Sequence, residues 1–135
     1  MSKGDVRGRI VRELLASGSS GLIVIYDSRR HPADYIRRFV DAISPAFRPR
    51  LALVPVDIAN CGGCHEELRS VLGVEGFEEP ILAFIHNRRV LWLQYGLFGD
   101  IEVDKEALRL GIWATLERWG LTPRRLGIRF DLIRG

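Results

Sequence analysis

The sequence predicts a three-layer α/β fold in which helices cover a central mixed sheet. Short, continuous apolar runs rich in β-branched residues occupy positions 21–26, 51–58 and 81–85, and such runs are typical of strands buried on both faces. Segments with apolar residues at helical spacing lie between and around these runs. The chain has 135 residues, of which 47% are hydrophobic and 27% charged. This length and balance predict a single globular domain over residues 1–135.

The first part of the chain predicts a helix, a strand and a second helix. Residues 5–17 carry apolar side chains at helical spacing and end at Gly18, so residues 1–20 predict an N-terminal helix. The run 21–26 predicts the first strand, and Pro32 suits the first turn of the helix that follows. The apolar stripe of this second helix comprises Tyr35, Ile36, Phe39, Val40 and Ile43.

The middle of the chain predicts a second strand, a short helix and a third strand. Residues 51–58 form the second apolar run. A short helix over 64–72 follows, and Gly73 suits its C-terminal cap because glycine readily adopts the left-handed conformation found there. The third strand, 81–85, begins directly after Pro80.

The last part predicts a hairpin followed by a long helix. The third strand turns back through residues 86–89 into a fourth strand at 90–95. Asp104 is expected to cap a final helix that ends at Gly120.

The C-terminal tail, residues 121–135, predicts an extra half-buried strand. Within it, the apolar residues Leu126, Ile128, Phe130 and Leu132 alternate with other residues up to Ile133, which is the period of a strand. The core of the domain then spans about 21–120, and the tail is an addition to it.

Four short landmarks mark the predicted elements. They are Val56-Asp57-Ile58 at a strand end, Leu72-Gly73-Val74 at a helix end, Glu79-Pro80-Ile81-Leu82 before the hairpin, and Tyr95-Gly96 after it. Their order and spacing resemble the thioredoxin-like fold over Gly21–Gly120. The resemblance implies a mixed four-stranded sheet with parallel crossovers in its middle and an antiparallel edge from the hairpin. It also implies that Pro80 is a cis proline on the substrate side of a catalytic disulfide.

The chain departs from the thioredoxin pattern where that family carries its catalytic cysteines. Thioredoxins have W-C-x-x-C directly after the first central strand, and residues 27–34 of this chain contain no cysteine. His31 or a neighbour occupies the place. We expect His31 to be a surface residue capping the helix; a polar role at a vestigial site is the alternative. Asp27 lies near enough in sequence for acid–base pairing with it. The only two cysteines come one strand later.

The segment Cys61-Gly62-Gly63-Cys64 is the main candidate site. Two cysteines at this spacing can cycle between dithiol and disulfide, and a helix N-terminus lowers the pKa of a nearby thiol. The resemblance implies that Cys61 attacks and Cys64 resolves, with protein thiols or disulfides as partners. His65 is a candidate for proton transfer, whereas Glu66 and Glu67 oppose thiolate formation. We therefore expect thiol–disulfide redox activity at this motif.

Three other interpretations of the motif are open. In a non-catalytic binding or scaffold protein of the same fold, Cys61 and Cys64 form a structural disulfide, although so short a loop gives a small entropic benefit. A zinc clip needs four ligands, and only His65 is adjacent, while His31 and His86 are remote in sequence. The string Cys61-Gly-Gly-Cys64-His65 also matches the C-x-x-C-H pattern of haem attachment, which generally belongs to exported proteins. We expect no metal or other cofactor, since no phosphate-binding glycine loop is visible.

Composition bears on location and partners. No apolar run reaches the ~18 residues needed to span a membrane, and no apolar signal core is visible, so we expect a cytoplasmic protein with no membrane partner. Arginine outnumbers lysine 18 to 2 and amides are scarce, which suits a thermophile. The arginine pairs are dispersed and the formal net charge is +3, so we expect an ion-paired surface and no nucleic-acid partner. Trp113 and the tail are candidate surfaces for a homodimer.

Overall fold

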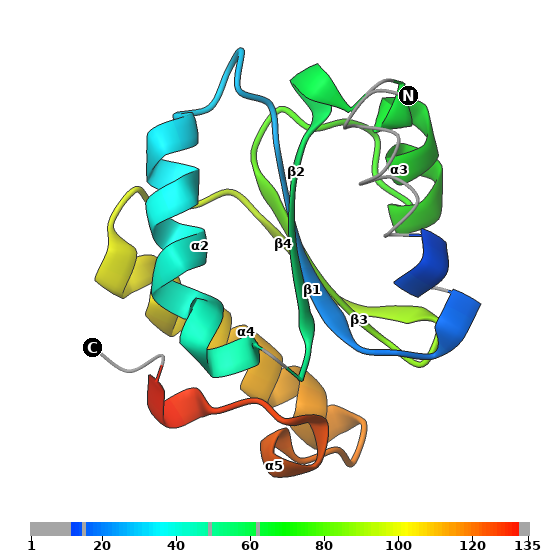
Figure 1. Ribbon diagram of the computed structural model, residues 1–135, viewed down its shortest axis with the longest axis vertical. Helices are drawn as coiled ribbons and strands as arrows, with labels where there is room; N and C mark the ends of the chain where they lie inside the picture. The colour runs from blue at the N-terminus through cyan, green and yellow to red at the C-terminus, as the bar shows by residue number, and fades with distance from the viewer. Residues whose placement is uncertain (1–11, 15, 49, 62, 133–135) are drawn as a thin grey trace.

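The computed structural model describes residues 12–14, 16–48, 50–61 and 63–132 and shows helices on both sides of a sheet (Figure 1). Most of the predicted N-terminal helix, residues 5–11 and 15, and the end of the predicted tail strand lie outside the described residues. No described helix is long and apolar enough to cross a membrane. The elements are β1 (Gly21–Tyr26), α2 (Ala33–Phe47), β2 (Ala52–Asp57), η1 (Ile58–Asn60), α3 (Cys64–Leu72), β3 (Ile81–His86), β4 (Arg89–Tyr95), α4 (Ile101–Arg118), α5 (Pro123–Leu126) and η2 (Phe130–Leu132).

The four strands form one mixed sheet in the order β2-β1-β3-β4. β1 and β2 are parallel, and α2 forms the predicted crossover between them. β3 runs antiparallel to β1, so the prediction of a second parallel crossover is wrong. The reason is the path of residues 73–80, which carries the chain back to the end of the sheet where β2 stops: Ile25 pairs with both Ile81 and Val56. The predicted hairpin of β3 and β4 is confirmed.

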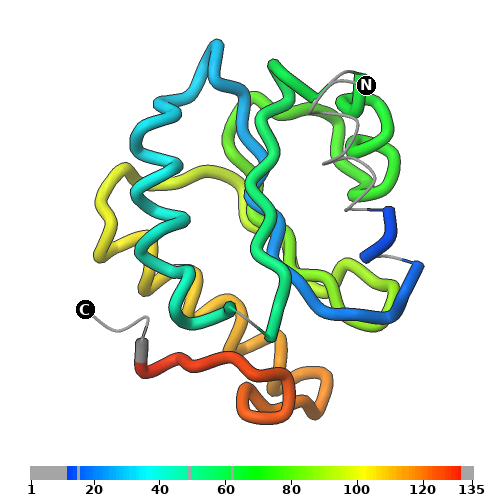
Figure 2. Tube along the Cα trace, in the orientation of Figure 1, coloured from blue at the N-terminus to red at the C-terminus, as the bar shows by residue number. Residues whose placement is uncertain are grey.

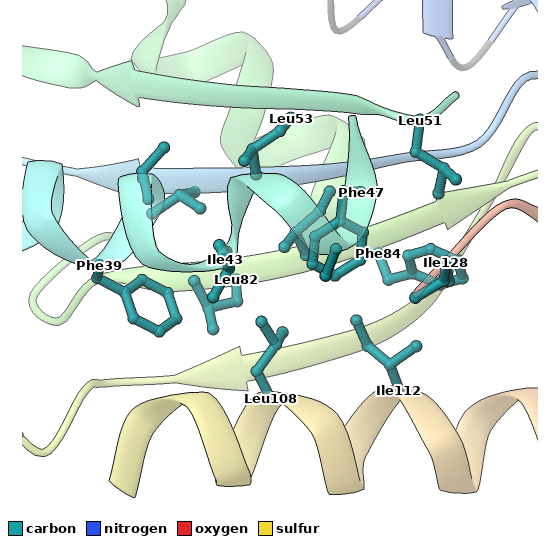
Figure 3. Close-up of a cluster of buried hydrophobic side chains, with 14 of the residues drawn as sticks. Phe39, Ile43, Phe47, Leu51, Leu53, Leu82, Phe84, Leu108, Ile112 and Ile128 are labelled. Atoms are coloured by element: carbon teal, nitrogen blue, oxygen red, sulfur yellow. The ribbon is translucent and has the colours of Figure 1, made fainter. Parts of the chain in front are cut away.

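One face of the sheet is covered by α2 and α4 (Figures 1 and 3). Leu22 and Val24 of β1 and Leu82 and Phe84 of β3 point to these helices, because alternate side chains of a strand share a face. Fully burying one such side chain stabilises the fold by about 1.5–3 kcal/mol. The helices contribute Tyr35, Ile36, Phe39, Val40, Ile43, Ala46, Phe47, Leu108, Ile112 and Leu116 to this first cluster.

The opposite face is covered by α3 and the described part of the N-terminal segment, whose residues 12–14 and 16–17 are helical as predicted. Ile23 and Ile25 of β1 point into this second cluster together with Leu14, Leu68 and both cysteines. Because the sheet is covered on both faces, its central strands consist of continuous apolar residues in the sequence. The resulting three-layer arrangement is compatible with the thioredoxin-like fold, and the tube in Figure 2 lets the chain be followed through it.

The C-terminal tail does not form the extra strand that its alternation predicts. It forms the short helices α5 and η2 instead, and Gly127 ends α5 with a φ of +84°, which glycine adopts readily. Ile128 is buried in the first cluster, and the Arg129 N–H donates to the carbonyl oxygen of Ala46 at 2.8 Å. The tail therefore packs against the end of α2. A backbone N–H of the tail is hydrogen-bonded to this helix and not to an edge strand of the sheet.

The cap of α4 is Asp100 and not Asp104 as predicted. The Asp100 carboxylate accepts a hydrogen bond from the Val103 N–H at 3.1 Å. Asp104 is fully buried in the first turn and accepts from the Tyr35 hydroxyl of α2. Burial and this bond raise the pKa of Tyr35. Asp104 thus holds the loop before α4 against α2, and it also accepts from the backbone N–H groups of Phe98 and Gly99.

Candidate functional site

The two cysteines form a disulfide in the loop that joins β2 to α3. Cys61 follows η1, and Cys64 is the first residue of α3. Their Cα atoms lie 5.4 Å apart, a separation that a disulfide bridges readily. Gly63 makes the turn with a φ of +94°, and a Cβ atom placed there would have no neighbour within 4 Å. Glycine is therefore required at this position for its backbone conformation and not for space.

Both cysteines are buried. Cys61 is 1% exposed and Cys64 is 6% exposed. They pack in the second cluster among aliphatic side chains of β1, β2 and α3, and Cys61 Sγ lies 3.7 Å from the Ile58 carbonyl oxygen. A disulfide in this position is shielded from solvent and from the sulfur atom of another protein.

Asp57, at the end of β2, organises the loop around the disulfide. Its carboxylate accepts hydrogen bonds from the Ala59 N–H at 3.0 Å, the Asn60 side-chain amide at 2.8 Å and the Ser28 N–H at 3.0 Å. Burial opposes ionisation of Asp57, but the hydrogen bonds from Ser28, Ala59 and Asn60 outweigh it and lower the pKa of this carboxyl. The loops after β1 and β2 are thereby fixed to each other. The sequence marks Asp57 only as a strand-end landmark.

His31 is buried, and the expectation that it is a surface residue is wrong. Its Nδ1 accepts a hydrogen bond from the Asp27 N–H at 2.8 Å, and its Nε2 lies 2.8 Å from the Glu78 carbonyl oxygen. A carbonyl only accepts, so Nε2 carries the proton and the ring is the neutral Nε2–H tautomer. His31 therefore links the loop after β1 to the segment before Pro80, and backbone groups satisfy both of its ring nitrogens.

Asp27 is buried beside His31 but does not form an acid–base pair with it. Its carboxylate accepts from the Arg29 guanidinium at 3.0 Å and 3.2 Å and from the Arg29 N–H at 3.0 Å. The hydrogen bond from the Arg29 side chain outweighs burial and lowers the pKa of Asp27. Both ring nitrogens of His31 are hydrogen-bonded to backbone groups, and the Asp27 carboxylate is bonded to Arg29. These described contacts position the two loops and leave neither ring nitrogen of His31 free for proton transfer.

His65 lines a polar cleft near the disulfide loop. The cleft has a volume of about 550 Å³ and is also lined by Asp27, Arg29, Ile58 and Phe77. The His65 ring meets Phe77 edge-on with centroids 5.3 Å apart, and its Nδ1 lies 3.6 Å from a Glu66 carboxylate oxygen. Neither cysteine lines the cleft, so a molecule bound there is separated from the sulfur atoms.

Pro80 lies at the same end of the sheet as the disulfide loop. It precedes Ile81, whose partner Ile25 also pairs with Val56 near the end of β2. Pro80 is partly exposed, and its carbonyl oxygen accepts from the Gly96 N–H at 2.7 Å. The topology therefore brings Pro80 and the cysteines to one edge, as expected. The role of Pro80 on a substrate side stays a prediction.

The described residues offer no group of three or more His, Cys, Asp and Glu side chains placed to hold a metal ion. The remote histidines are engaged elsewhere: His31 as described above, and His86 through Nδ1 with the Ser20 hydroxyl at 2.6 Å. The cysteine sulfurs are bonded to each other and have no thiolate to offer a metal in this state. The arrangement can thus close a loop or, once reduced, present a dithiol.

No protein-family model matches the chain, and no curated protein is significantly similar to it in sequence.

Proposed function

We propose that this chain is a non-catalytic binding protein of the thioredoxin-like fold, in which Cys61–Cys64 is a structural clip. The observation that carries the proposal is the burial of both sulfur-bearing residues, at 1% and 6% exposure, inside an apolar cluster. Thiol–disulfide exchange requires a thiolate to reach a sulfur atom. An apolar environment also raises the pKa of a thiol and so disfavours the thiolate.

Two further features support a structural role. The first turn of α3 carries Glu66 and Glu67, whose charges disfavour a thiolate on Cys64. The place where thioredoxins keep their nucleophile is filled by His31, with both ring nitrogens hydrogen-bonded. His31 therefore joins the loop after β1 to the segment before Pro80 and carries no free nitrogen for catalysis.

A disulfide-reduction assay tests this proposal. The protein is incubated with insulin and dithiothreitol beside the Cys61→Ser, Cys64→Ser double variant, and the precipitation of reduced insulin is followed. We expect the two proteins to give the same rate as dithiothreitol alone. Faster turnover by the unmodified protein than by the double variant would contradict the structural role.

Thiol–disulfide exchange is the second candidate, and one observation favours it. Cys64 is the first residue of α3 and is more exposed than Cys61. The positive end of a helix stabilises a thiolate. In the reduced protein, the Cys64 thiolate attacks a protein disulfide, forms a mixed disulfide with one substrate sulfur and releases the other as a thiolate. Cys61 then attacks the Cys64 sulfur, which forms the Cys61–Cys64 bond and releases the second substrate thiolate, so the substrate is reduced and the cysteine pair is oxidised. The roles are the reverse of those that the thioredoxin resemblance implies.

Single variants identify the attacking residue if exchange occurs. With Cys61→Ser, a Cys64 nucleophile remains trapped as a mixed disulfide with substrate, which mass spectrometry detects. With Cys64→Ser, no such adduct forms. An adduct on neither variant would remove this second candidate.

A further inference from the structure

Arginines that are dispersed in the sequence meet at the end of the sheet opposite the disulfide loop. The pairing of Gly21 with Ala52 and Ile85 places the start of β2 and the β3–β4 turn at this end. The C-terminal end of α4 and the whole of α5 lie there as well (Figure 1). We call this region the basic end; its arginines are Arg48, Arg50, Arg88, Arg89, Arg118, Arg124, Arg125 and Arg129.

The basic end has little negative charge to neutralise it. Its segments, residues 48, 50–51, 86–89 and 117–131, hold eight arginines and two acidic residues, Glu117 and Asp131. Every ion pair found between described residues involves other basic side chains. Arg29 and Arg37 show the contrast, since each pairs with a nearby aspartate. The predicted ion-paired surface is thus present on other parts of the molecule. At the basic end, none of the ion pairs found between described residues involves an arginine, and the Arg48 guanidinium donates a hydrogen bond to the Leu53 carbonyl oxygen at 2.9 Å.

One cleft of the basic end joins two of these arginines to a tryptophan. It has a volume of about 460 Å³ and is lined by the β3–β4 turn, including Arg88 and Arg89, and by Trp119 and Leu121. Trp119 follows α4 and is 48% exposed. The exposed indole ring offers a flat face to a planar group, and the guanidinium groups beside it offer donors to an anionic group.

The turn that supplies Arg88 has an unfavourable residue at its tip. Asn87 and Arg88 have φ values of +51° and +69°, and a two-residue hairpin turn of this kind prefers Asn-Gly. Arginine in the left-handed region is disfavoured relative to glycine. Arg88 therefore occupies a backbone position that the turn alone favours for glycine, which points to a use for its side chain outside folding.

A second cleft of the basic end also combines arginines with a half-exposed tryptophan. It has a volume of about 540 Å³ and is lined by Arg50, Arg124 and Arg129 together with Trp113 and Phe130. Trp113 is 44% exposed, and its ring lies 5.6 Å from that of Phe130 between centroids. Asp131 is the one carboxylate among the described residues that line it.

We propose that the basic end binds single-stranded nucleic acid, with phosphates on the guanidinium groups and bases stacked on Trp119 and Trp113. Guanidinium groups suit phosphate oxygens, and aromatic faces suit unpaired bases of any sequence. An acidic peptide would satisfy the charges but would offer no planar group to the half-exposed Trp119 ring. Trp113 already packs beside Phe130 and donates from Nε1 to Glu117 at 2.9 Å, which leaves its exposed face for a base. This proposal names a partner for the binding role proposed above, yet it uses the end of the molecule remote from the disulfide.

Fluorescence anisotropy with a labelled oligothymidylate of about 12 nucleotides tests the proposal on the full, oxidised chain. We expect saturable binding that weakens as salt is added, with log Kd changing by about 0.7 per log unit of salt for each phosphate contacted. An abasic oligomer of the same length should bind about 5- to 100-fold more weakly, because stacking is lost. Trp119→Leu should reduce that difference, because one of the two stacking rings is removed.

Two arginine variants separate binding from folding. Arg88→Gly should weaken oligothymidylate binding and lower the salt dependence while leaving the melting temperature equal or higher, because glycine suits the turn. Arg37→Ala, which removes an exposed arginine of α2 outside the basic end, should leave binding unchanged.

Three results would overturn the proposal: no binding at low salt, equal binding of the abasic oligomer, or equal competition by a polyglutamate peptide of matched charge. The last result would assign the basic end to an acidic polypeptide. None of these results bears on the insulin assay, so failure of this proposal and failure of the structural role of the disulfide are distinguishable.

Discussion

Breaking the Cys61–Cys64 bond should destabilise the protein by an amount that the structure lets one estimate. The two cysteines are three positions apart. In the chain-entropy model, closing a loop this short lowers the conformational entropy of the unfolded chain by about 6 cal/mol/K. The disulfide then raises the free energy of unfolding by about 2 kcal/mol at 25 °C. For a chain of 135 residues, a change of 1 kcal/mol shifts the melting temperature by about 3–5 °C. The expected loss is therefore about 6–10 °C.

The assay compares oxidised protein with protein that has been unfolded, reduced and refolded without oxidant. Thermal unfolding is followed by circular dichroism at a fixed scan rate, with thiol titration confirming each state. The Cys61→Ala, Cys64→Ala variant should lose about 1–2 kcal/mol more than the reduced protein, because two buried sulfur atoms are removed from a packed cluster. A shift below about 2 °C on reduction would refute the reasoning that this disulfide stabilises the native state.

Three other perturbations have defined outcomes. His31→Ala should lower the free energy of unfolding by about 2–4 kcal/mol in urea titrations, because the buried N–H of Asp27 and the carbonyl of Glu78 lose their hydrogen-bond partner. A decrease of less than about 0.5 kcal/mol would contradict a stabilising role for these two hydrogen bonds. Asp27 and Asp57 have lowered pKa values in the folded protein, so their stabilising effect is fully present above the unfolded value of about 3.9 and is lost as pH falls through the folded values. Stability should thus decline below about pH 4, and Asp57→Asn should flatten that decline; identical acid profiles would contradict the assignment. Gly111→Ala places a Cβ atom 2.4–2.7 Å from the Trp92 indole and should cost about 1–3 kcal/mol by overpacking, whereas Gly76→Ala, with no atom within 4 Å, should be close to neutral.

The strands and helices were predictable because their signals are local. The runs at β1, β2 and β3 are apolar on both faces, and the sheet is covered on both faces. Gly73 ends α3 in the left-handed conformation that a glycine cap predicts. The direction of β3 was not predictable in the same way, because it depends on where residues 73–80 run in space and not on any pattern within the strand.

The errors at the tail and at His31 share a cause. Alternation in the tail matches a strand, but Ile128 is buried against the end of α2 by a turn that Gly127 allows. A lone histidine in a polar loop suggests exposure, but His31 is buried because backbone groups of two distant loops satisfy both nitrogens. In each case tertiary partners decide the outcome, and those partners are invisible in the local sequence.

The candidate site was predicted only in part. The C-x-x-C motif identified the pair of residues and their disulfide distance, and it placed them before a short helix. Its spacing could not reveal that both residues are buried, since burial follows from the packing of α3 on the sheet. The basic end was missed for a similar reason: its arginines come from four separate segments that meet only when the topology is known.

Reduction of the native disulfide is the most direct test of its structural role. The folded protein is treated with dithiothreitol under native conditions, alkylated, and analysed by mass spectrometry beside a sample unfolded in guanidinium. We expect Cys61 and Cys64 to remain oxidised and unlabelled in the folded protein and to be fully labelled after unfolding. Equal labelling of both samples, with the circular dichroism of the folded sample unchanged, would contradict a buried structural clip.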